Sequence, residues 1–279
     1  MKSWKIYVTF FKKLYDEHYS TDDSLNLKNF TFVKVNDEYE MELSSNNLDY
    51  DIFFEHEFKT YNAELQKKGY HQNSVLYHLY KNNSHKEYDY IGFIEYDHVL
   101  TNEFCKTIQT TIDDTDKDQI FFFNTFNFSQ LWDQGILMNP YRLKKQEGNP
   151  RSKWNCIKVI LDDYNNFFDT NYTLQDLAQK NCFPICHAAL MPSNIFEKIM
   201  KFHAFIIESG KVEKYHRFNW RSNAGLMERY FAVELVLEKA KVVDFIQLEH
   251  REMPIKVMKP EWKEESLLKK LRSRLWGKI

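Results

Sequence analysis

Glycine is scarce in this sequence, with 7 glycines among 279 residues. Collagen-like repeats and glycine-rich, low-complexity architectures depend on this residue, so the composition excludes them. Charge of one sign is lacking as well, because 38 Lys and Arg side chains nearly balance 40 Asp and Glu side chains, for a formal net charge of −2. A chain without a strong positive field is not drawn to nucleic acid, and we expect no nucleic-acid partner.

Long apolar segments and paired cysteines are also missing. No uncharged apolar run is long enough to cross a bilayer, and lysines interrupt the first residues too early for a signal peptide. The four cysteines, Cys105, Cys156, Cys182 and Cys186, form no Cys-x-x-Cys pair and lack the spacing of a zinc or redox site. Buried, reduced thiols are the ordinary alternative, so we expect a cytoplasmic protein.

Three motifs of common enzyme classes are absent from the sequence. It contains no Gly-x-Gly-x-x-Gly, no P-loop and no Gly-x-Ser-x-Gly. These motifs bind dinucleotides, bind nucleoside triphosphates and present a catalytic serine, respectively. Their absence argues against a dehydrogenase, a kinase and a hydrolase.

Apolar and aromatic side chains are abundant, at 43% and 16% of the residues, which is enough for one sizeable core. Apolar runs predict strands at residues 5–10, 30–35 (an edge strand), 51–54, 88–97, 119–123, 183–191 and 242–248. Helical spacing predicts helices at residues 62–81, 102–112, 172–180, 195–209 and 225–239. This alternation predicts an α/β fold with a mixed sheet, in one domain over residues 1–258.

An acidic triplet, Glu95-Tyr96-Asp97, closes the predicted strand at 88–97. Residues two apart on a strand point to the same side, so the two carboxylates converge where an open α/β sheet binds its ligands. Two such carboxylates could hold Mg²⁺ or Mn²⁺, which would neutralise a diphosphate leaving group. The spacing alone is more typical of a solvated turn, and it is the apolar strand before the triplet that favours a functional site.

Glu228 lies near the start of the last predicted helix, at its third position if the helix begins at Gly225. An acidic residue there commonly caps the helix or interacts with its dipole. The functional alternative is a carboxylate that deprotonates an acceptor hydroxyl or fixes a sugar hydroxyl. Arg229 could pair with Glu228 or with phosphate. The sequence does not decide between these roles.

Other polar residues have an ordinary explanation beside a functional one. Gln72 and Asn73 could line a pocket for a donor substrate, although a place on the solvent-exposed face of the helix at 62–81 is the commoner explanation. His187, on the predicted strand 183–191, is more typical of a hydrogen-bonded core histidine than of a catalyst. His250 could add an imidazole ligand and Lys256 could meet phosphate oxygens, but alone they are more typical of a solvated basic tail.

Residues 259–279 form a basic, amphipathic segment with seven basic and three acidic residues, which leaves a net charge of +4. Leu267, Leu268, Leu271, Leu275 and Ile279 share one helical face. Such a helix suits peripheral contact with an anionic membrane surface. It suits equally well a position against the core of the domain itself.

Short motifs at residues 77–82, 89–98 and 225–231 follow one another in an order similar to that of GT-A-type glycosyltransferases. Tyr-His-Leu-Tyr-Lys-Asn at residues 77–82 leads into Asp-Tyr-Ile-Gly at 89–92 and its polar end at 95–98. Gly-Leu-Met-Glu-Arg-Tyr-Phe follows at residues 225–231. Over residues 5–250 the chain resembles this family, in particular the group that makes capsular and surface polysaccharides.

The resemblance implies a GT-A-like fold, in which helices flank a mixed, mainly parallel sheet. It implies transfer of a sugar from a nucleotide-diphosphate donor to a hydroxyl of a glycan acceptor, with Mn²⁺ or Mg²⁺ as cofactor. The chain departs from the usual Asp-x-Asp of this family, since it has Glu-x-Asp at residues 95–97. His250, Lys256 and Lys259-Pro260 also resemble the His…Lys-Pro ending of retaining galactosyltransferases.

Roles for individual residues follow from this resemblance together with the motifs. The predicted catalytic residues are Glu228 and Asp97, and the predicted metal ligands are Glu95, Asp97 and His250. The predicted donor-binding residues are Tyr7, Thr9, Gln72, Asn73, Tyr77, Lys81, Glu95, His187, Arg229 and Lys256. Residues 141–151 are expected to form a mobile loop that closes over the donor.

Two other functions are compatible with the sequence. A non-catalytic carbohydrate-binding or scaffold protein could keep the same fold, and the aromatic content and altered acidic triplet allow it. A nucleotidyltransferase would also use paired carboxylates, but it would consume a nucleoside triphosphate, and the sequence has no glycine-rich loop to bind one.

Overall fold

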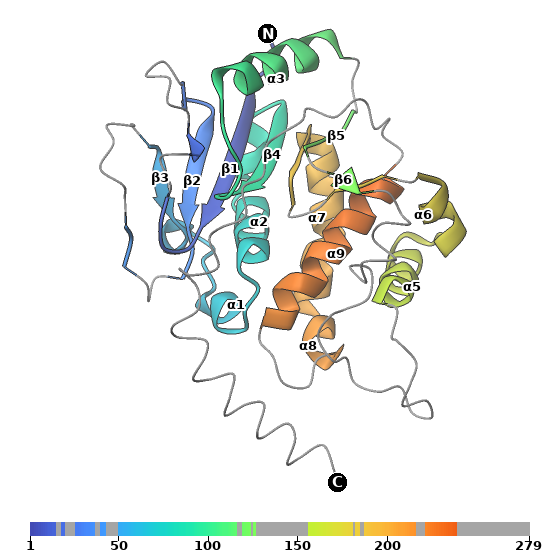
Figure 1. Cartoon of the computed structure of the whole chain (residues 1–279). Coiled ribbons are helices and arrows are strands. Elements are labelled where there is room, and N and C mark those ends of the chain that lie inside the picture. The colour runs from blue at the N-terminus through green and yellow to red at the C-terminus, as the bar shows by residue number, and fades with distance from the viewer. Residues whose placement is uncertain are drawn as a thin grey trace.

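A six-stranded mixed sheet forms the centre of the protein in the computed structural model (Figure 1). The structure describes residues 1–14, 18–19, 26–36, 40–42, 50–115, 119–123, 125–126, 156–180, 182–184, 187–215 and 221–238. The strand order is β3-β2-β1-β4-β8-β5. These strands are β1 (Trp4–Phe10), β2 (Phe30–Lys34), β3 (Ile52–Phe54), β4 (Tyr90–Glu95), β5 (Phe121–Phe122) and β8 (Ala189–Pro192).

The sheet is mainly parallel, with one reversed strand. Strands β3, β2, β1 and β4 are parallel neighbours. Strand β8 runs antiparallel to both β4 and β5, so β5 shares the direction of the other four. A separate two-stranded sheet joins β6 (Thr125–Phe126) to β7 (Phe183–Pro184). The predicted α/β fold with a mixed sheet is therefore confirmed.

Helices cover both faces of the large sheet. They are α1 (Ala63–Lys67), α2 (Gln72–Lys81), α3 (Asn102–Asp114), α5 (Cys156–Phe168), α6 (Leu174–Lys180), α7 (Ser193–Glu208), α8 (Lys211–Tyr215) and α9 (Arg221–Leu237), with short 3₁₀ turns at Glu55–Glu57 and Ser84–Glu87. Figure 1 shows α3 apart from the group formed by α2, α7 and α9. This separation divides the core into two clusters.

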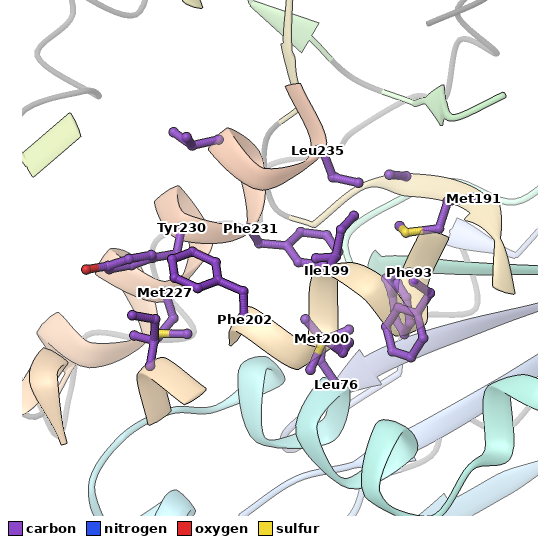
Figure 2. Close-up of a cluster of buried hydrophobic side chains, with 14 of the residues drawn as sticks. Leu76, Phe93, Met191, Ile199, Met200, Phe202, Met227, Tyr230, Phe231 and Leu235 are labelled. Atoms are coloured by element: carbon purple, nitrogen blue, oxygen red, sulfur yellow. The ribbon is translucent and has the colours of Figure 1, made fainter. Parts of the chain in front are cut away.

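Alternation along the strands explains the two clusters, because successive side chains of a strand point to opposite faces. Val8 and Ile94 lie in one buried cluster with Phe104 of α3. Tyr7 and Phe93 lie in the other cluster, together with residues of α2, α7 and α9. Figure 2 shows part of this second cluster, in which Phe93 and Met191 from the sheet lie near side chains of the helices. Thr9 and Glu95 lie two residues beyond Tyr7 and Phe93 on β1 and β4, so they point to the same face of the sheet.

Several elements differ from their predicted form. The predicted helix at 62–81 is two helices, because Gly69 takes a φ of 76° that ends α1 before α2 begins. The predicted edge strand at 30–35 is internal: β2 lies between β3 and β1 and is buried along its length. The predicted strand at 183–191 is two strands in different sheets, with His187 in the turn between them.

Helix boundaries follow local chemistry in two cases. Thr173 precedes α6 and forms a capping box with Asp176, since Thr173 N donates to Asp176 Oδ2 at 2.6 Å and Asp176 N donates to Thr173 Oγ1 at 3.3 Å. Gly210, with a φ of 61°, ends α7 as predicted. Helix α9 begins at Arg221 rather than at Gly225, which changes the position of Glu228 within it.

Some predicted features lie outside the described residues: the strand at 242–248, the loop at 141–151 and the helix at 259–279. Within the described ranges, no helix combines the length and apolar character needed to cross a membrane.

Candidate active site

The parallel strands bring the acidic triplet to the carboxyl edge of the sheet. Thr9, near the end of β1, lies directly opposite Glu95, the last residue of β4. The chain then turns across the edge, where the amide of Tyr96 donates to the carbonyl of Thr9 at 3.1 Å. Glu95 continues the face that carries Phe93, so its side chain points to the side covered by α2 and α9. This is the edge at which open α/β sheets bind ligands.

Glu95 is the centre of the site. Its Oε1 accepts a hydrogen bond from Gln72 Nε2, in the first turn of α2, at 2.8 Å. Burial raises the pKa of Glu95 well above its ordinary value, and the nearby carboxylates of Asp97 and Glu228 raise it further. Neighbouring negative charges act on a carboxyl group in this way because they disfavour its ionised form. Asp97 and Glu228 therefore lie close enough to Glu95 to interact with it electrostatically, although Glu228 is more than 130 residues away in the sequence.

Asp97 is held by the residue that follows it. The Nδ1 atom of His98 lies 3.2 Å from Asp97 Oδ1 and 3.0 Å from the carbonyl oxygen of Glu95. The side chain of Asp97 is 15% exposed and that of His98 is 1% exposed. His98 Nδ1 thus bonds to the backbone of Glu95 and lies beside the carboxylate of Asp97. Its role was not predicted, although it belongs to the polar end of the strand motif.

Glu228 reaches the triplet because α9 is fastened to the turn between α1 and α2. The amide of Ala224 donates to the carbonyl of Gly69 at 3.1 Å, and Asn223 Nδ2 donates to the carbonyl of Lys68 at 2.8 Å. Since α9 begins at Arg221, Glu228 lies beyond the first turn of the helix. Capping or a dipole interaction at a third helical position is therefore the wrong explanation for this residue.

Arg229 follows Glu228 on α9 and is half-buried. Its Nη1 donates to the carbonyl of Gly225, one turn earlier in the same helix. This bond fixes part of the guanidinium group against its own helix, and a role in binding phosphate stays a prediction.

Asn73 and His187 are buried rather than exposed to a ligand. Asn73 is 0% exposed and His187 is 4% exposed. They bond to each other, with His187 Nε2 2.9 Å from Asn73 Oδ1. Thr9 is also buried, at 8% exposure. The structure therefore places Asn73 and His187 behind Gln72, in contact with neighbouring protein groups.

Three other predicted donor residues lie elsewhere. Tyr7 is buried in the core, stacks on Phe93 with ring centroids 6.1 Å apart, and has a raised pKa because of its burial. Tyr77 and Lys81 contact Glu208 of α7, at 2.9 Å and 2.6 Å. Lys81 ends α2, about 13 Å along the helix axis from the first turn that faces Glu95. His250 and Lys256 lie outside the described residues.

A buried group of serine and histidine from α2 and a glutamate from the 3₁₀ turn at Glu55–Glu57 resembles a catalytic triad only in composition. His78 Nδ1 is 2.9 Å from Glu55 Oε1, while His78 Nε2 accepts from the amide of Asn62 at 3.0 Å. Ser74 Oγ bonds to Glu55 instead of to the histidine. A histidine that activates a serine needs its free nitrogen at the hydroxyl. This group therefore has a structural role, which is to join α2 to the 3₁₀ turn at Glu55–Glu57.

The carboxylates of the site offer the ligand type that a hard cation prefers. Mg²⁺ and Mn²⁺ bind oxygen donors, and Glu95, Asp97 and Glu228 supply carboxylate oxygens in one region. In the part of the chain that the structure describes, no three His, Cys, Asp or Glu side chains are already arranged around a common metal position. A cation here would therefore need ligands beyond these side chains, such as phosphate oxygens or water.

Comparison with known proteins adds no name to this arrangement. No protein-family model matches the chain, and no curated protein matches it. The resemblance to surface-polysaccharide glycosyltransferases therefore stays a prediction from the short motifs of the sequence.

Proposed function

We propose that this chain is a glycosyltransferase that moves a sugar from a nucleotide-diphosphate donor to a hydroxyl of a glycan acceptor. The observation that carries the proposal is the convergence of Glu95, Asp97 and Glu228 at the carboxyl edge of a mainly parallel sheet. The order of the motifs at residues 77–98 and 225–231 supports a GT-A-like fold for the same region. The two lines of support are independent, since one comes from tertiary geometry and the other from sequence.

Asp97 and Glu95 are assigned to the diphosphate side of the site. A bound Mn²⁺ or Mg²⁺ would supply positive charge that stabilises the leaving diphosphate. The fit is chemical: burial and then the carboxylates of Asp97 and Glu228 raise the pKa of Glu95, and a dication would offset the repulsion between these groups. Gln72 orients Glu95 through its hydrogen bond.

Glu228 is assigned to the acceptor side. It comes from α9, which covers the face of the sheet to which Glu95 points, so a sugar bound there would meet carboxylates from both the helix and the strand end. In the transfer, Glu228 would accept the proton of the acceptor hydroxyl as that oxygen attacks the anomeric carbon. The bond from the anomeric carbon to the diphosphate breaks, and the electron pair leaves with the diphosphate.

Turnover of UDP- and GDP-sugars, measured with and without Mn²⁺, tests this proposal. We expect wild-type protein to release nucleoside diphosphate and Asp97→Asn to reduce the rate by about a hundredfold or more, as for other groups that stabilise developing charge. The matched control is Asp113→Asn, on the distant helix α3, which should retain the rate. Equal rates for wild type and Asp97→Asn would exclude the assigned role.

Thermal stability in the presence of the same nucleotide sugars separates an enzyme from a scaffold that only keeps the fold. A donor present at a hundred times its dissociation constant should stabilise the native state by about 2.7 kcal/mol. No nucleotide-dependent stabilisation, together with no turnover, would favour the non-catalytic alternative.

A further inference from the structure

We propose that the buried pair formed by Asn73 and His187 positions the acidic site without contacting the donor. This inference rests on the proposed function for its consequence in catalysis, whereas the geometry on which it depends can be tested without any substrate. The pair is buried and polar, and Asn73 lies in the first turn of α2 next to Gln72, which reaches Glu95.

The side chain of Asn73 joins three elements. Its Nδ2 donates to the carbonyl of Tyr70, before α2, at 3.1 Å and to the carbonyl of Ala224, in α9, at 3.3 Å. Two carbonyl acceptors fix the orientation of the amide, because only its nitrogen carries hydrogens. The oxygen must therefore face His187, in the turn between β7 and β8, whose Nε2 is 2.9 Å away.

This orientation also fixes the tautomer of His187. Because Asn73 Oδ1 can only accept, His187 Nε2 must carry the hydrogen. Burial, with a smaller effect of His203, lowers the pKa of His187 to about 3, so the ring is neutral at ordinary pH. The ring also packs against Phe231 of α9, with centroids 5.1 Å apart. His187 therefore holds α9 both by packing and through Asn73.

The two active-site groups that converge on Glu95 are attached to this pair from opposite sides. Gln72 is the neighbour of Asn73 in the first turn of α2, and Glu228 lies one helical turn after Ala224, the acceptor of the Asn73 amide. Loss of the pair would let α9 and the start of α2 move relative to each other. Both the hydrogen bond from Gln72 and the proximity of Glu228 to Glu95 would then weaken.

The side-chain amide of Gln72 reports on this arrangement in the full-length protein without ligand. Its ¹⁵N NMR signal can be assigned with Gln72→Met, and its hydrogens should exchange slowly because Nε2 donates to Glu95. His187→Leu removes the bond to Asn73. His187→Gln keeps an N–H donor on the same backbone, whose φ of 56° strains both replacements equally.

The matched control is Tyr230→Phe, which removes a different buried hydrogen bond of α9, from Tyr230 Oη to Asp163 Oδ2 at 2.6 Å. We expect the Gln72 amide to shift towards the position of exposed glutamines and to exchange faster in His187→Leu. It should keep its wild-type behaviour in His187→Gln and Tyr230→Phe. Should His187→Leu fail to fold, Asn73→Ser breaks the same pair from the other partner. An unchanged Gln72 signal in a folded pair-breaking variant would overturn the inference.

Turnover gives the second readout. His187→Leu is expected to lose about ten- to a hundredfold in kcat/KM, because small displacements of reacting groups have effects of this size, and His187→Gln should recover most of it. If His187 contributed to stability alone, His187→Leu and His187→Gln would have equal kcat/KM once both are folded. No turnover by wild-type protein would reject the proposed function, and the NMR comparison would still decide the positioning role.

Discussion

Gln72 donates a hydrogen bond from Nε2 to Glu95 Oε1 at 2.8 Å, and this contact joins the first turn of α2 to the end of β4. It connects α2, the helix that carries most of the motif at residues 77–82, to the acidic triplet at residues 95–97. Gln72 is a predicted donor-binding residue, and in the proposed enzyme this contact would let it act on the donor through Glu95.

Gln72→Met removes this donor while keeping the length of the side chain. We expect a loss of about 1 kcal/mol in the free energy of unfolding, because the half-buried carboxyl group of Glu95 loses a hydrogen bond. Chemical denaturation measures the change. Gln175→Met, at an exposed position of α6, is the control and should change stability little. A similar small effect in both variants would mean that the Gln72 contact contributes nothing to folding.

Gly92→Ala should destabilise the sheet next to the site. A Cβ atom at this position would lie 2.8 Å from Ile6 Cγ1, 3.0 Å from Leu190 Cδ1 and 3.1 Å from the carbonyl oxygen of Ala189. Strands β1, β4 and β8 must shift to admit it, and overpacking of this kind costs about 1 to 3 kcal/mol. The melting temperature is the measurement. A stability equal to or above that of wild type would contradict the close packing of these strands.

Because of His187, we expect the folded protein to lose stability at acidic pH. Its pKa is lowered to about 3 in the folded protein, whereas an unfolded histidine titrates near 6.5. Between these values the unfolded chain binds one more proton at this residue, so stability falls as the pH is lowered, by about 1.4 kcal/mol per pH unit. Urea unfolding of wild type and His187→Gln between pH 5 and pH 6 should show a shallower dependence in the variant. Parallel curves would contradict the neutral, buried ring.

Glu234 should make the stability of the fold depend on pH in the opposite direction. Burial raises its pKa well above the ordinary value, so the folded protein retains a proton that the unfolded chain releases above about pH 4.5. Its contribution to stability is present below that pH and is lost as the pH rises through the folded pKa. The difference in unfolding free energy between Glu234→Gln and wild type should therefore favour the variant more at pH 7 than at pH 4.5, as measured by urea unfolding. His203, 3.4 Å away, is the facing titratable group, and its own pKa is lowered to about 3 by burial. An equal difference at both pH values would contradict a protonated Glu234.

The elements with strong, uninterrupted signals could be predicted from the sequence. Strands β1 and β4 are continuous apolar runs, and α3 and α7 have clear helical spacing with definite ends. Helix α5 was not predicted, although Ile157, Ile160, Leu161 and Tyr164 are buried at helical spacing, and this pattern was sufficient to find it. Gly69 could have divided the helix at 62–81, since glycine readily adopts positive φ.

The acidic site could be predicted only in part. The triplet at the end of β4 follows from local sequence, but the approach of Glu228 depends on contacts between α9 and the turn at Lys68 and Gly69, which no local pattern specifies. The sequence favoured a hydrogen-bonded core position for His187, which the structure shows, but the burial of Asn73 and its pairing with His187 were missed because the two residues meet only in the tertiary structure.

The reversed strand β8 has a consequence for how the chain can fold. Among the described strands of the large sheet, β5 pairs with β8 alone, and β8 follows it in the sequence after α5 and α6. The parallel group β1 to β4 can assemble early, but β5 cannot join the sheet until β8 has entered between it and β4. During synthesis on the ribosome, the outer edge of β4 therefore stays open while the middle of the chain emerges. An open, apolar edge invites pairing with other chains, so nascent protein should depend on chaperones most strongly before residues 189–192 are available.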